Sequence, residues 1–390
     1  MKPWRAVGNG LLMPVLTAVM LLGGCSAELF GDPEADFGDY RQRLARVFDT
    51  AFPAAPPPPE VLSPRYPQRR DLQLQASEFS LGILDIFALD ACTVGQLVAQ
   101  RNSALGKVMS ASAVWRYEQA FLASVDDCVQ TLGEDAAEAT ALMTALTEVR
   151  DIKRRELGIA QWNATFASAE FQSMFSTGDG LLQRNFRVAP SQQLSRVLER
   201  LLAYVEGEPT AALEDLETIN ATLVANPYPG RVLLSTQAMT AELESISDTL
   251  EALMTGGDGK PCRPAMLDEE TSKIAVNVLE QVYVKRIQPY LAELQKAGHA
   301  WIGPLARLAD AISIEEQPAV FKAFAEKYLD PKAGIWADFQ AASRRHASLW
   351  TQVRPPVRPG SAAASVTEPD SAAGSDVVAA ASGLASDCSR

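Results

Sequence analysis

The sequence has few of the residues that most metal and catalytic sites need. Its 390 residues include two histidines, His299 and His346, and neither has a second histidine at helical spacing. This excludes a multi-histidine metal site, and a Ser-His-Asp triad would have to use one of these two. We expect His299 at a helix end and His346, beside two arginines, on a solvated face. Cys-x-x-Cys pairs, a P-loop and a calcium-loop ligand series are also absent.

Basic charge is also scarce. The chain has 35 lysines and arginines against 48 aspartates and glutamates, a net charge of −13. An acidic chain without a basic stripe binds nucleic acid poorly, so we expect no nucleic-acid partner. Alternating strand patterns are nearly absent as well, which leaves helices as the main structural element.

The start of the chain resembles a bacterial lipoprotein signal. Two basic residues precede a short apolar run over residues 11–22, which is too short for the roughly 20 residues of a membrane span. Leu22-Gly23-Gly24-Cys25 then looks like a lipobox. The resemblance implies cleavage before Cys25, which receives a diacylglycerol and an N-acyl chain. The alternative is an ordinary signal with an incidental cysteine.

Residue 26 is serine rather than aspartate. In the enterobacterial sorting scheme that this signal resembles, such a residue favours the outer membrane. We therefore predict an outer-membrane lipid anchor on the periplasmic side, with the inner membrane, periplasmic side, as the alternative. Removing two positive charges with the signal takes the net charge from −13 to −15. Anionic lipid surfaces would repel that charge, so the acyl chains must hold the protein on the membrane. We expect no other cofactor.

The cysteines favour one disulfide. Cys92 and Cys128 each lie 18 residues from Ser110, near which two predicted helices are separated. An antiparallel hairpin folding there would bring the two cysteines together. Closing that loop would stabilise the fold by roughly 3–4 kcal/mol in the chain-entropy model. Two buried free thiols are the alternative, and the pairing of Cys262 and Cys388 stays open.

Apolar side chains repeat at helical spacing through most of the chain. We predict an all-α fold: an antiparallel helical bundle with a disulfide-tied helical hairpin, a flexible N-terminal tether and a disordered C-terminal tail. Ser191 is the expected cap of one helix. The predicted helices cover residues 39–52, 191–205, 210–223, 231–255, 269–297 with a kink at Pro289, 301–313, 317–328 and 335–350.

The chain divides by composition into four parts. Residues 354–390 lack aromatic residues and are dominated by Ala, Ser, Gly and Pro, which predicts disorder. A sub-boundary is possible near residues 226–230. The predicted parts are the signal peptide 1–24, the tether 25–35, the helical domain 36–353 and the tail 354–390.

The predicted hairpin carries the best polar cluster. Asn102 and Ser103 are poor residues for the middle of a helix. Asn102 lies eight residues before Ser110 and Glu118 eight residues after it, so the two could face one another. The favoured interpretation is an internal hydrogen-bond network that fixes helix register, with a helix break at Asn102-Ser103; the alternative is a site for a small anionic or peptidic ligand. The candidate residues are Arg101, Asn102, Ser103, Lys107 and Glu118, with Arg101 or Lys107 neutralising Glu118.

The same region carries a family resemblance. The residues concerned are Leu89-Asp90-Ala91-Cys92, Gln100 to Val108, Tyr117-Glu118, Phe121-Leu122 and Cys128. They resemble an uncharacterised family of proteobacterial lipoproteins, domain-of-unknown-function family 3080, over about residues 36–350. The resemblance implies the lipoprotein address and a helical fold, and it transfers no activity.

These observations favour a protein that is not an enzyme. We predict an interaction or assembly module of the envelope, held on the membrane by lipid and partnered by an envelope protein. The second hypothesis is a binding module for a small anionic or peptidic envelope ligand. The third is an unrecognised hydrolase, which would need a deep cleft with a perturbed carboxylate or serine.

Overall fold

The computed structural model describes residues 31–56, 64–77, 89, 92–132, 139–207, 216–254 and 269–353. All regular structure in these ranges is helical, which confirms the all-α prediction. The helices are α1 (Pro33–Phe48), α2 (Arg69–Leu72), α4 (Thr93–Asn102), α5 (Ala111–Leu132), α6 (Ala139–Ala164), α7 (Ala169–Met174), α8 (Ala189–Val205), α9 (Leu216–Ala225), α10 (Tyr228–Met254), α11 (Glu269–Val278), α12 (Gln288–Ala311), α13 (Ala319–Tyr328) and α14 (Gly334–Val353), with a 3-10 turn η3 (Gly106–Val108) and a π-helix η5 (Leu279–Ile287). The predicted signal peptide, Cys25, Cys262, Cys388 and the tail lie outside the described residues.

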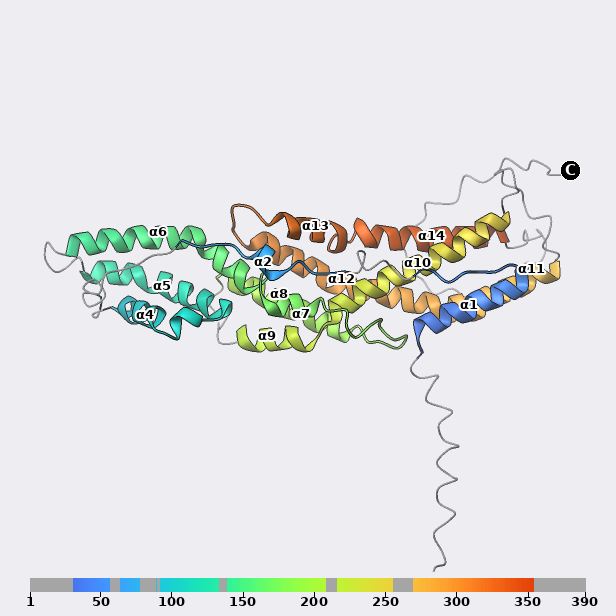
Figure 1. The fold of residues 1–390 in the computed structure, drawn as a ribbon, viewed down its shortest axis with the longest axis horizontal. Helices are drawn as coiled ribbons and strands as arrows, with labels where there is room; N and C mark the ends of the chain where they lie inside the picture. Colours follow the sequence, from blue (N-terminus) through green and yellow to red (C-terminus); the bar gives the residue numbers. More distant parts are fainter. Residues whose placement is uncertain are drawn as a thin grey trace, which may run out of the picture.

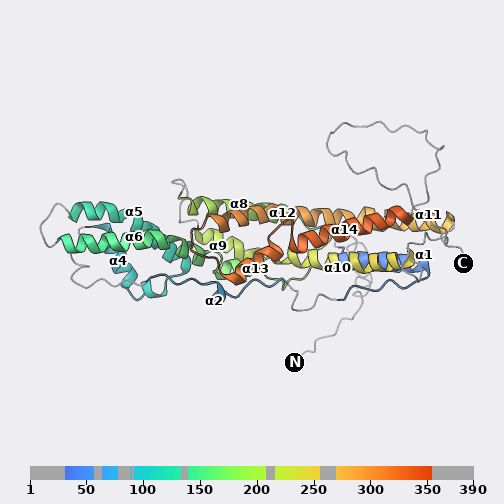
Figure 2. The same cartoon turned by 90° about the horizontal axis from the view of Figure 1, so that it is seen from above.

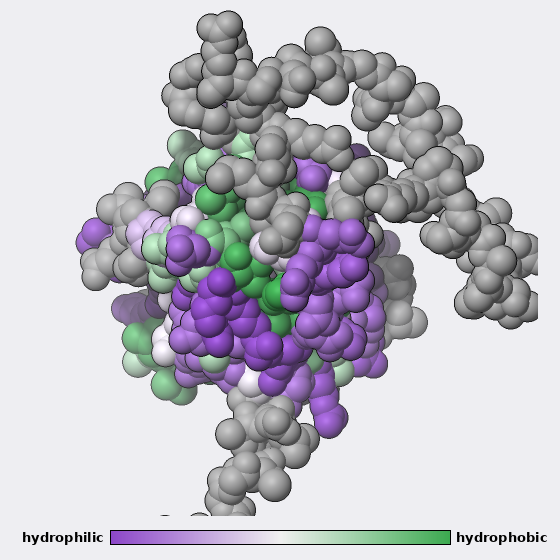
Figure 3. Space-filling model, turned by 90° about the vertical axis from the view of Figure 1, so that its right-hand side faces the viewer, coloured by the Kyte–Doolittle hydropathy of each residue, from purple (hydrophilic) through white to green (hydrophobic). Residues whose placement is uncertain are grey.

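The body is elongated (Figure 1). Helices α4, α5 and α6 form one end, and α1 and α11 lie at the other, as the view from above also shows (Figure 2). Between these ends, α8 packs against α12 and α10 packs against α14. At the end that carries α11, hydrophilic side chains cover most of the visible face around a hydrophobic band (Figure 3).

The described residues form two hydrophobic cores. The smaller core consists of ten buried side chains from Leu89, α4, α5 and the start of α6. The larger core takes in α1, the end of α6 and the helices that follow it. Leu223 and Val232, on either side of residues 226–230, both belong to the larger core.

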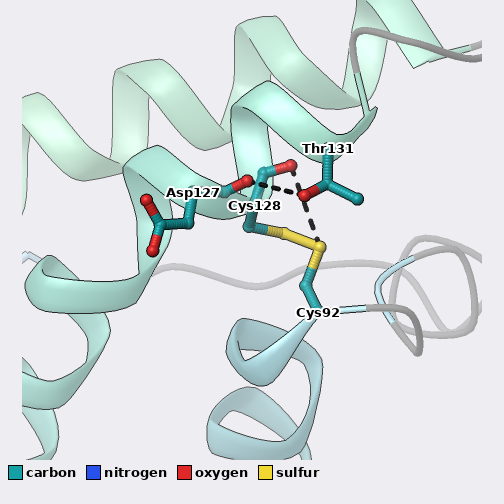
Figure 4. Close-up of a disulfide and its surroundings, with 4 residues drawn as sticks. All are labelled: Cys92, Asp127, Cys128 and Thr131. Carbon is teal, nitrogen blue, oxygen red and sulfur yellow. Dashed lines mark hydrogen bonds between the residues drawn. A yellow bond between two sulfur atoms is a disulfide. The ribbon is translucent and has the colours of Figure 1, made fainter.

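The disulfide-tied hairpin is confirmed. Cys92, just before α4, and Cys128, near the end of α5, form a disulfide with Cα atoms 5.4 Å apart (Figure 4). The turn between the helices is longer than the expected break, because α4 already ends at Asn102 and α5 begins at Ala111. The predicted helix break at Asn102-Ser103 is therefore present.

Helix boundaries differ from the predicted ones where caps and prolines decide them. The Asp32 side chain accepts a hydrogen bond from the Glu34 backbone N–H at 3.0 Å, and Pro33 takes the first turn, so α1 begins six residues before the expected Asp39. The last residues of the predicted tether 25–35 are therefore helical.

One further expectation about a helix was wrong: Ser191 does not cap α8, because the helix begins at Ala189 and Ser191 is buried inside it. Near the predicted kink at Pro289, the π-helix η5 comes directly before α12, and the Gln288 N–H bonds to the Tyr283 carbonyl, a five-residue step. Proline cannot donate this kind of bond, and its ring disturbs the preceding turn, which fits the wider π spacing there.

His346 is fully buried, so its predicted place on a solvated face was wrong. Its Nε2 atom accepts hydrogen bonds from Tyr40 Oη at 3.2 Å and Trp350 Nε1 at 3.1 Å. Because an indole N–H only donates, the ring proton lies on Nδ1 and faces Ser247 Oγ at 3.3 Å. Burial lowers the pKa of His346 to about 3. A neutral histidine thus joins α1, α10 and α14.

His299 also lies elsewhere than predicted. It is inside α12 rather than at a helix end, and its ring lies 5.7 Å from the Trp336 ring. His346 contacts one hydroxyl group, that of Ser247, and both residues are fully buried.

Charged residues fasten α1 to η5. Asp36, only 5% exposed, accepts hydrogen bonds from Arg184 at 3.1 Å and from Arg286 Nε at 2.9 Å. Arg286 also pairs with Asp39 at 2.7 Å. Since Asp36 and Asp39 lie on the same face of α1, this cluster fixes how the first described helix sits on the body.

Candidate functional site

A cleft of about 360 Å³ opens between three parts of the chain that are distant in sequence. One wall is the segment of residues 64–77, which we call the strap; it is mostly extended and includes the single turn α2. The other walls are residues 109–118, at the start of α5, and residues 153–163 of α6.

Side chains of α6 hold the strap by its main chain. Asn163 accepts a hydrogen bond from the Leu74 N–H at 3.0 Å and donates one to the Leu74 carbonyl at 2.8 Å. The preceding residue, Trp162, adds a further bond to the strap, because its Nε1 donates to the Leu72 carbonyl at 2.9 Å. Glu156 accepts bonds from the Ser77 N–H at 2.8 Å and the Ser77 hydroxyl at 2.5 Å.

The spacing of these contacts fits an extended chain. Glu156 and Asn163 are seven residues apart, about 10.5 Å along a helix. Leu74 and Ser77 are three residues apart, about 10 Å along an extended chain. The two side chains therefore hold two points of the strap without stretching either element.

Deeper in the cleft lies an ion pair. Lys153 Nζ contacts the two carboxylate oxygens of Glu118 at 2.7 and 2.6 Å. The side chains are only 13% and 16% exposed, and the ammonium lies 5.2 Å from the Tyr117 ring centre. Burial raises the pKa of Tyr117, and the charge of Glu118 raises it further. The pair is therefore largely removed from water, which makes each charge costly to leave unpaired.

Sequence reasoning found Glu118 but missed Lys153. A signal was present, because α6 carries Leu142, Leu146 and Val149 on one stripe at steps of four and three. Continuing the same steps gives Lys153, Glu156, Ala160 and Asn163. Three polar residues thus replace apolar ones on the inward stripe, and those three line the cleft.

The other four predicted site residues lie at the hairpin tip, residues 103–108, or directly before it. Arg101 donates to the Gly106 carbonyl, while Ser103 Oγ accepts from the Gly106 N–H at 3.0 Å. Asn102 and Lys107 are exposed. Neither Arg101 nor Lys107 is the ion-pair partner of Glu118. Of the expected cluster, Glu118 therefore lies in the cleft, whereas the other four residues lie at the tip or directly before it.

Several local hydrogen bonds fix the conformation of the tip. Ser103 Oγ also donates to the Gln100 carbonyl at 2.7 Å, and Lys107 N–H bonds to the Ser103 carbonyl at 3.2 Å. A Cβ atom on Gly106 would lie 2.2 Å from the Arg101 carbonyl oxygen. Only glycine fits there, which lets the turn close tightly on the end of α4.

This well-defined turn exposes apolar and basic side chains. Leu105 is 81% and Val108 76% exposed, the highest values among the exposed large hydrophobic residues that the structure describes. Residues 93–117 contain three cations, Arg101, Lys107 and Arg116, and no acidic residue. In a chain of net charge −13 this segment is basic, although the Glu217 carboxylate of α9 lies beside it, on the Ser112 hydroxyl at 2.7 Å. An apolar group displayed by a rigid turn is typical of a contact site.

The groups of the cleft are suited to binding. Its charged and amide groups can hold charged ends and main-chain amides, while Met109, Val114 and Ile159 supply apolar contact. Within the described ranges, no three His, Cys, Asp or Glu side chains are placed to hold a metal ion. In the same ranges, no helix has both the length and the apolar content needed to cross a membrane.

Comparison with known proteins gives one positive finding. The model of the family described as "Protein of unknown function (DUF3080)" matches residues 37–353. No curated protein and no solved structure matches the chain. The matched range contains the strap, the cleft and the tip.

Proposed function

The chain belongs to the DUF3080 family, whose description assigns no function, and we propose that it is a non-enzymatic interaction module of the bacterial envelope. It is held by lipid on Cys25, on the periplasmic side of the outer membrane, with the inner membrane as the alternative. The tip makes the contact with a partner. The observation that carries this proposal is the rigid turn that displays Leu105 and Val108.

The tip predicts the chemistry of its partner. Covering Leu105 and Val108 would contribute roughly 1.5–3 kcal/mol for each side chain. The basic residues of the same segment, Arg101, Lys107 and Arg116, favour carboxylates. The partner is therefore an envelope protein that presents apolar side chains flanked by acidic residues. A lipid surface is less favoured, because two side chains bury little area and the chain as a whole is acidic.

The shape of the body supports an anchored module. Helix α1 begins at Pro33, eight residues after Cys25, and lies at one end of the body. The section with α4, α5 and α6 lies at the opposite end (Figure 1). A lipid on Cys25 would therefore tether one end of the protein and leave the hairpin section at the other, with the tip close to the start of α9, where Ser112 donates to Glu217 at 2.7 Å.

Photo-crosslinking in cells tests the proposal. A photoreactive phenylalanine derivative is placed at Leu105, at Val108, or at Val320, an exposed valine on α13 that serves as the matched control. We expect one protein adduct from positions 105 and 108 and none from 320. We also expect that Lys107→Glu weakens the adduct and that Cys25→Ser abolishes it.

Several outcomes would contradict the proposal. Adducts with lipid alone would replace the protein partner by a membrane surface. The same adducts at 105 and 320 would show non-specific contact, and no adduct at either tip position would remove the tip from consideration. A mature chain without acyl groups, measured by intact mass, would remove the anchor.

A further inference from the structure

We propose that the cleft binds a short zwitterionic peptide of two or three residues, with its carboxylate at Lys153 and its ammonium at Glu118. This site is separate from the tip and does not depend on a protein partner there. The proposal rests on the ion pair, on the way α6 already holds an extended chain, and on the balance of charges in the cleft.

The ion pair joins α6 to α5. Glu156 and Asn163 bond to the strap directly, and Lys153 bonds to Glu118 on α5. An apolar pair of similar volume would serve packing between α5 and α6 equally well or better. Two opposite charges kept at 13% and 16% exposure inside a cleft are instead what a ligand with two charged ends would require.

The strap shows how α6 recognises an extended peptide. Leu74 and Ser77 bond to α6, while Gln73, Ala76 and also Ser77 line the cleft. This three-residue repeat is typical of an extended, polyproline-like chain. A second extended peptide in the cleft would lie beside the strap, within reach of the Gln73 amide. The Asn163 amide group has two N–H donors, one of which bonds to the Leu74 carbonyl.

The lining selects against ligands of a single charge. Arg69 and Lys153 are balanced by Glu118 and Glu156, so a lone anion or cation would disturb a neutral set of charges. A zwitterion separates Lys153 from Glu118 and gives each of them a new opposite charge. Every charged group then remains paired, which avoids the cost of a buried unpaired ion.

Size and apolar surface complete the selection. Met109, Val114 and Ile159 offer contact for an aliphatic side chain. A volume of about 360 Å³ lies near the lower end of ligand pockets, which suits a di- or tripeptide better than a longer chain. The ligand class is therefore a free short peptide with at least one apolar side chain.

Calorimetric titration of the full mature chain with synthetic peptides tests the site. The probes are Ala-Leu and Ala-Ala-Leu with both ends free, and the same peptides with an acetylated amine or an amidated carboxylate. We expect saturable binding of the free peptides and at least about tenfold weaker binding when either end is blocked. Equal binding of free and blocked forms, or no binding of either free peptide up to about 10 mM, would overturn the proposal.

Variants assign the binding to the cleft. The double variant Lys153→Met with Glu118→Gln removes both charges and keeps similar volumes, and we expect it to lose at least about tenfold in affinity. The matched control is Lys322→Met with Glu316→Gln, an exposed ion pair at 2.9 Å, which should bind like the wild type. Unfolding curves check that both variants are folded. Unchanged affinity in the Lys153 variant, or equal loss in the control, would place the peptide elsewhere.

Discussion

The two cores of this protein are stabilised in different ways. In the hairpin section, ten buried side chains and the Cys92–Cys128 disulfide form the whole of the described core. The larger core has many buried aromatic rings, such as Trp162 stacked on Phe166 with centroids 4.8 Å apart, and it also holds His346. A small core gains much from a covalent link, whereas a large one can tolerate a buried polar network.

The largest expected effect comes from removing the disulfide of the hairpin section. We expect Cys92→Ala with Cys128→Ala to destabilise the hairpin section by roughly 3–4 kcal/mol, because the unfolded loop is no longer closed. Hydrogen exchange measured by mass spectrometry should show faster exchange in peptides from α4 and α5. Peptides from α10 and α12 are the internal control and should keep their protection. An equal loss in both sets would mean that the two cores unfold as one unit.

Acidification should affect the larger core instead. The pKa of His346 is about 3 in the folded protein and about 6.5 in an unfolded chain, so below pH 6.5 the unfolded state binds a proton that the folded state excludes. Stability is therefore lost as the pH falls from about 6.5 toward 3, by about 2 kcal/mol at pH 5. Urea unfolding at pH 7 and pH 5 measures this contribution.

The matching variant is His346→Gln, which keeps polar atoms but does not titrate. It should have lower stability at pH 7 and a smaller loss between pH 7 and pH 5 than the wild type. His299→Gln is the control; burial lowers the pKa of His299 as well, but this residue is more exposed than His346. If His346→Gln kept the full pH dependence, other groups would be responsible for it.

A smaller effect is expected at the tip of the hairpin section. Gly106→Ala places a Cβ atom 2.2 Å from a backbone oxygen, so the turn must shift, and we expect a loss of about 1–3 kcal/mol. The control is Gly38→Ala in α1, where a Cβ atom would meet only the end of the Arg41 side chain, at 3.9 Å. That change should stabilise the helix by up to about 1 kcal/mol. Thermal unfolding compares the two, and a neutral Gly106→Ala would show that the turn is loose.

The smallest effect on stability is expected at Leu105. Because this side chain is 81% exposed, Leu105→Ser should change the free energy of unfolding by less than about 0.5 kcal/mol. The same variant should weaken the crosslink formed from position 108. Leu146→Ala, in the smaller core, is the contrasting control and should cost about 2–5 kcal/mol. A large loss with Leu105→Ser would mean that the tip is buried against another part of the protein.

Local patterns were enough to predict the hairpin and many of the helices, although α6 and α7 were not among the predicted ranges. The apolar stripes and the equal distances of Cys92 and Cys128 from Ser110 depend only on sequence spacing. His346 was misjudged because its neighbour Arg345 does lie at the surface, paired with Asp248 at 2.6 Å. Each helical residue turns by about 100°, so adjacent residues can face solvent and core.

The candidate site was harder to predict, because it depends on which helices meet. Glu118 was placed against Arg101 or Lys107 from the geometry of one hairpin, while its partner Lys153 comes from α6, a third helix. The strap wall of the cleft is formed mostly by chain outside regular secondary structure, whose sequence shows no helical pattern of apolar residues. Helix propensity carries no information about either contact.

The strap also determines how the protein would respond to mechanical force. It runs antiparallel to α6, since Tyr66 bonds to the Phe166 carbonyl at one end and Ser77 bonds to Glu156 at the other. A pull on the N-terminal side of the strap therefore loads these bonds lengthwise along the helix. Bonds loaded in shear share the force and break together, whereas bonds loaded at one end open in sequence. The side chains that position the cleft thus also make this connection resistant to tension.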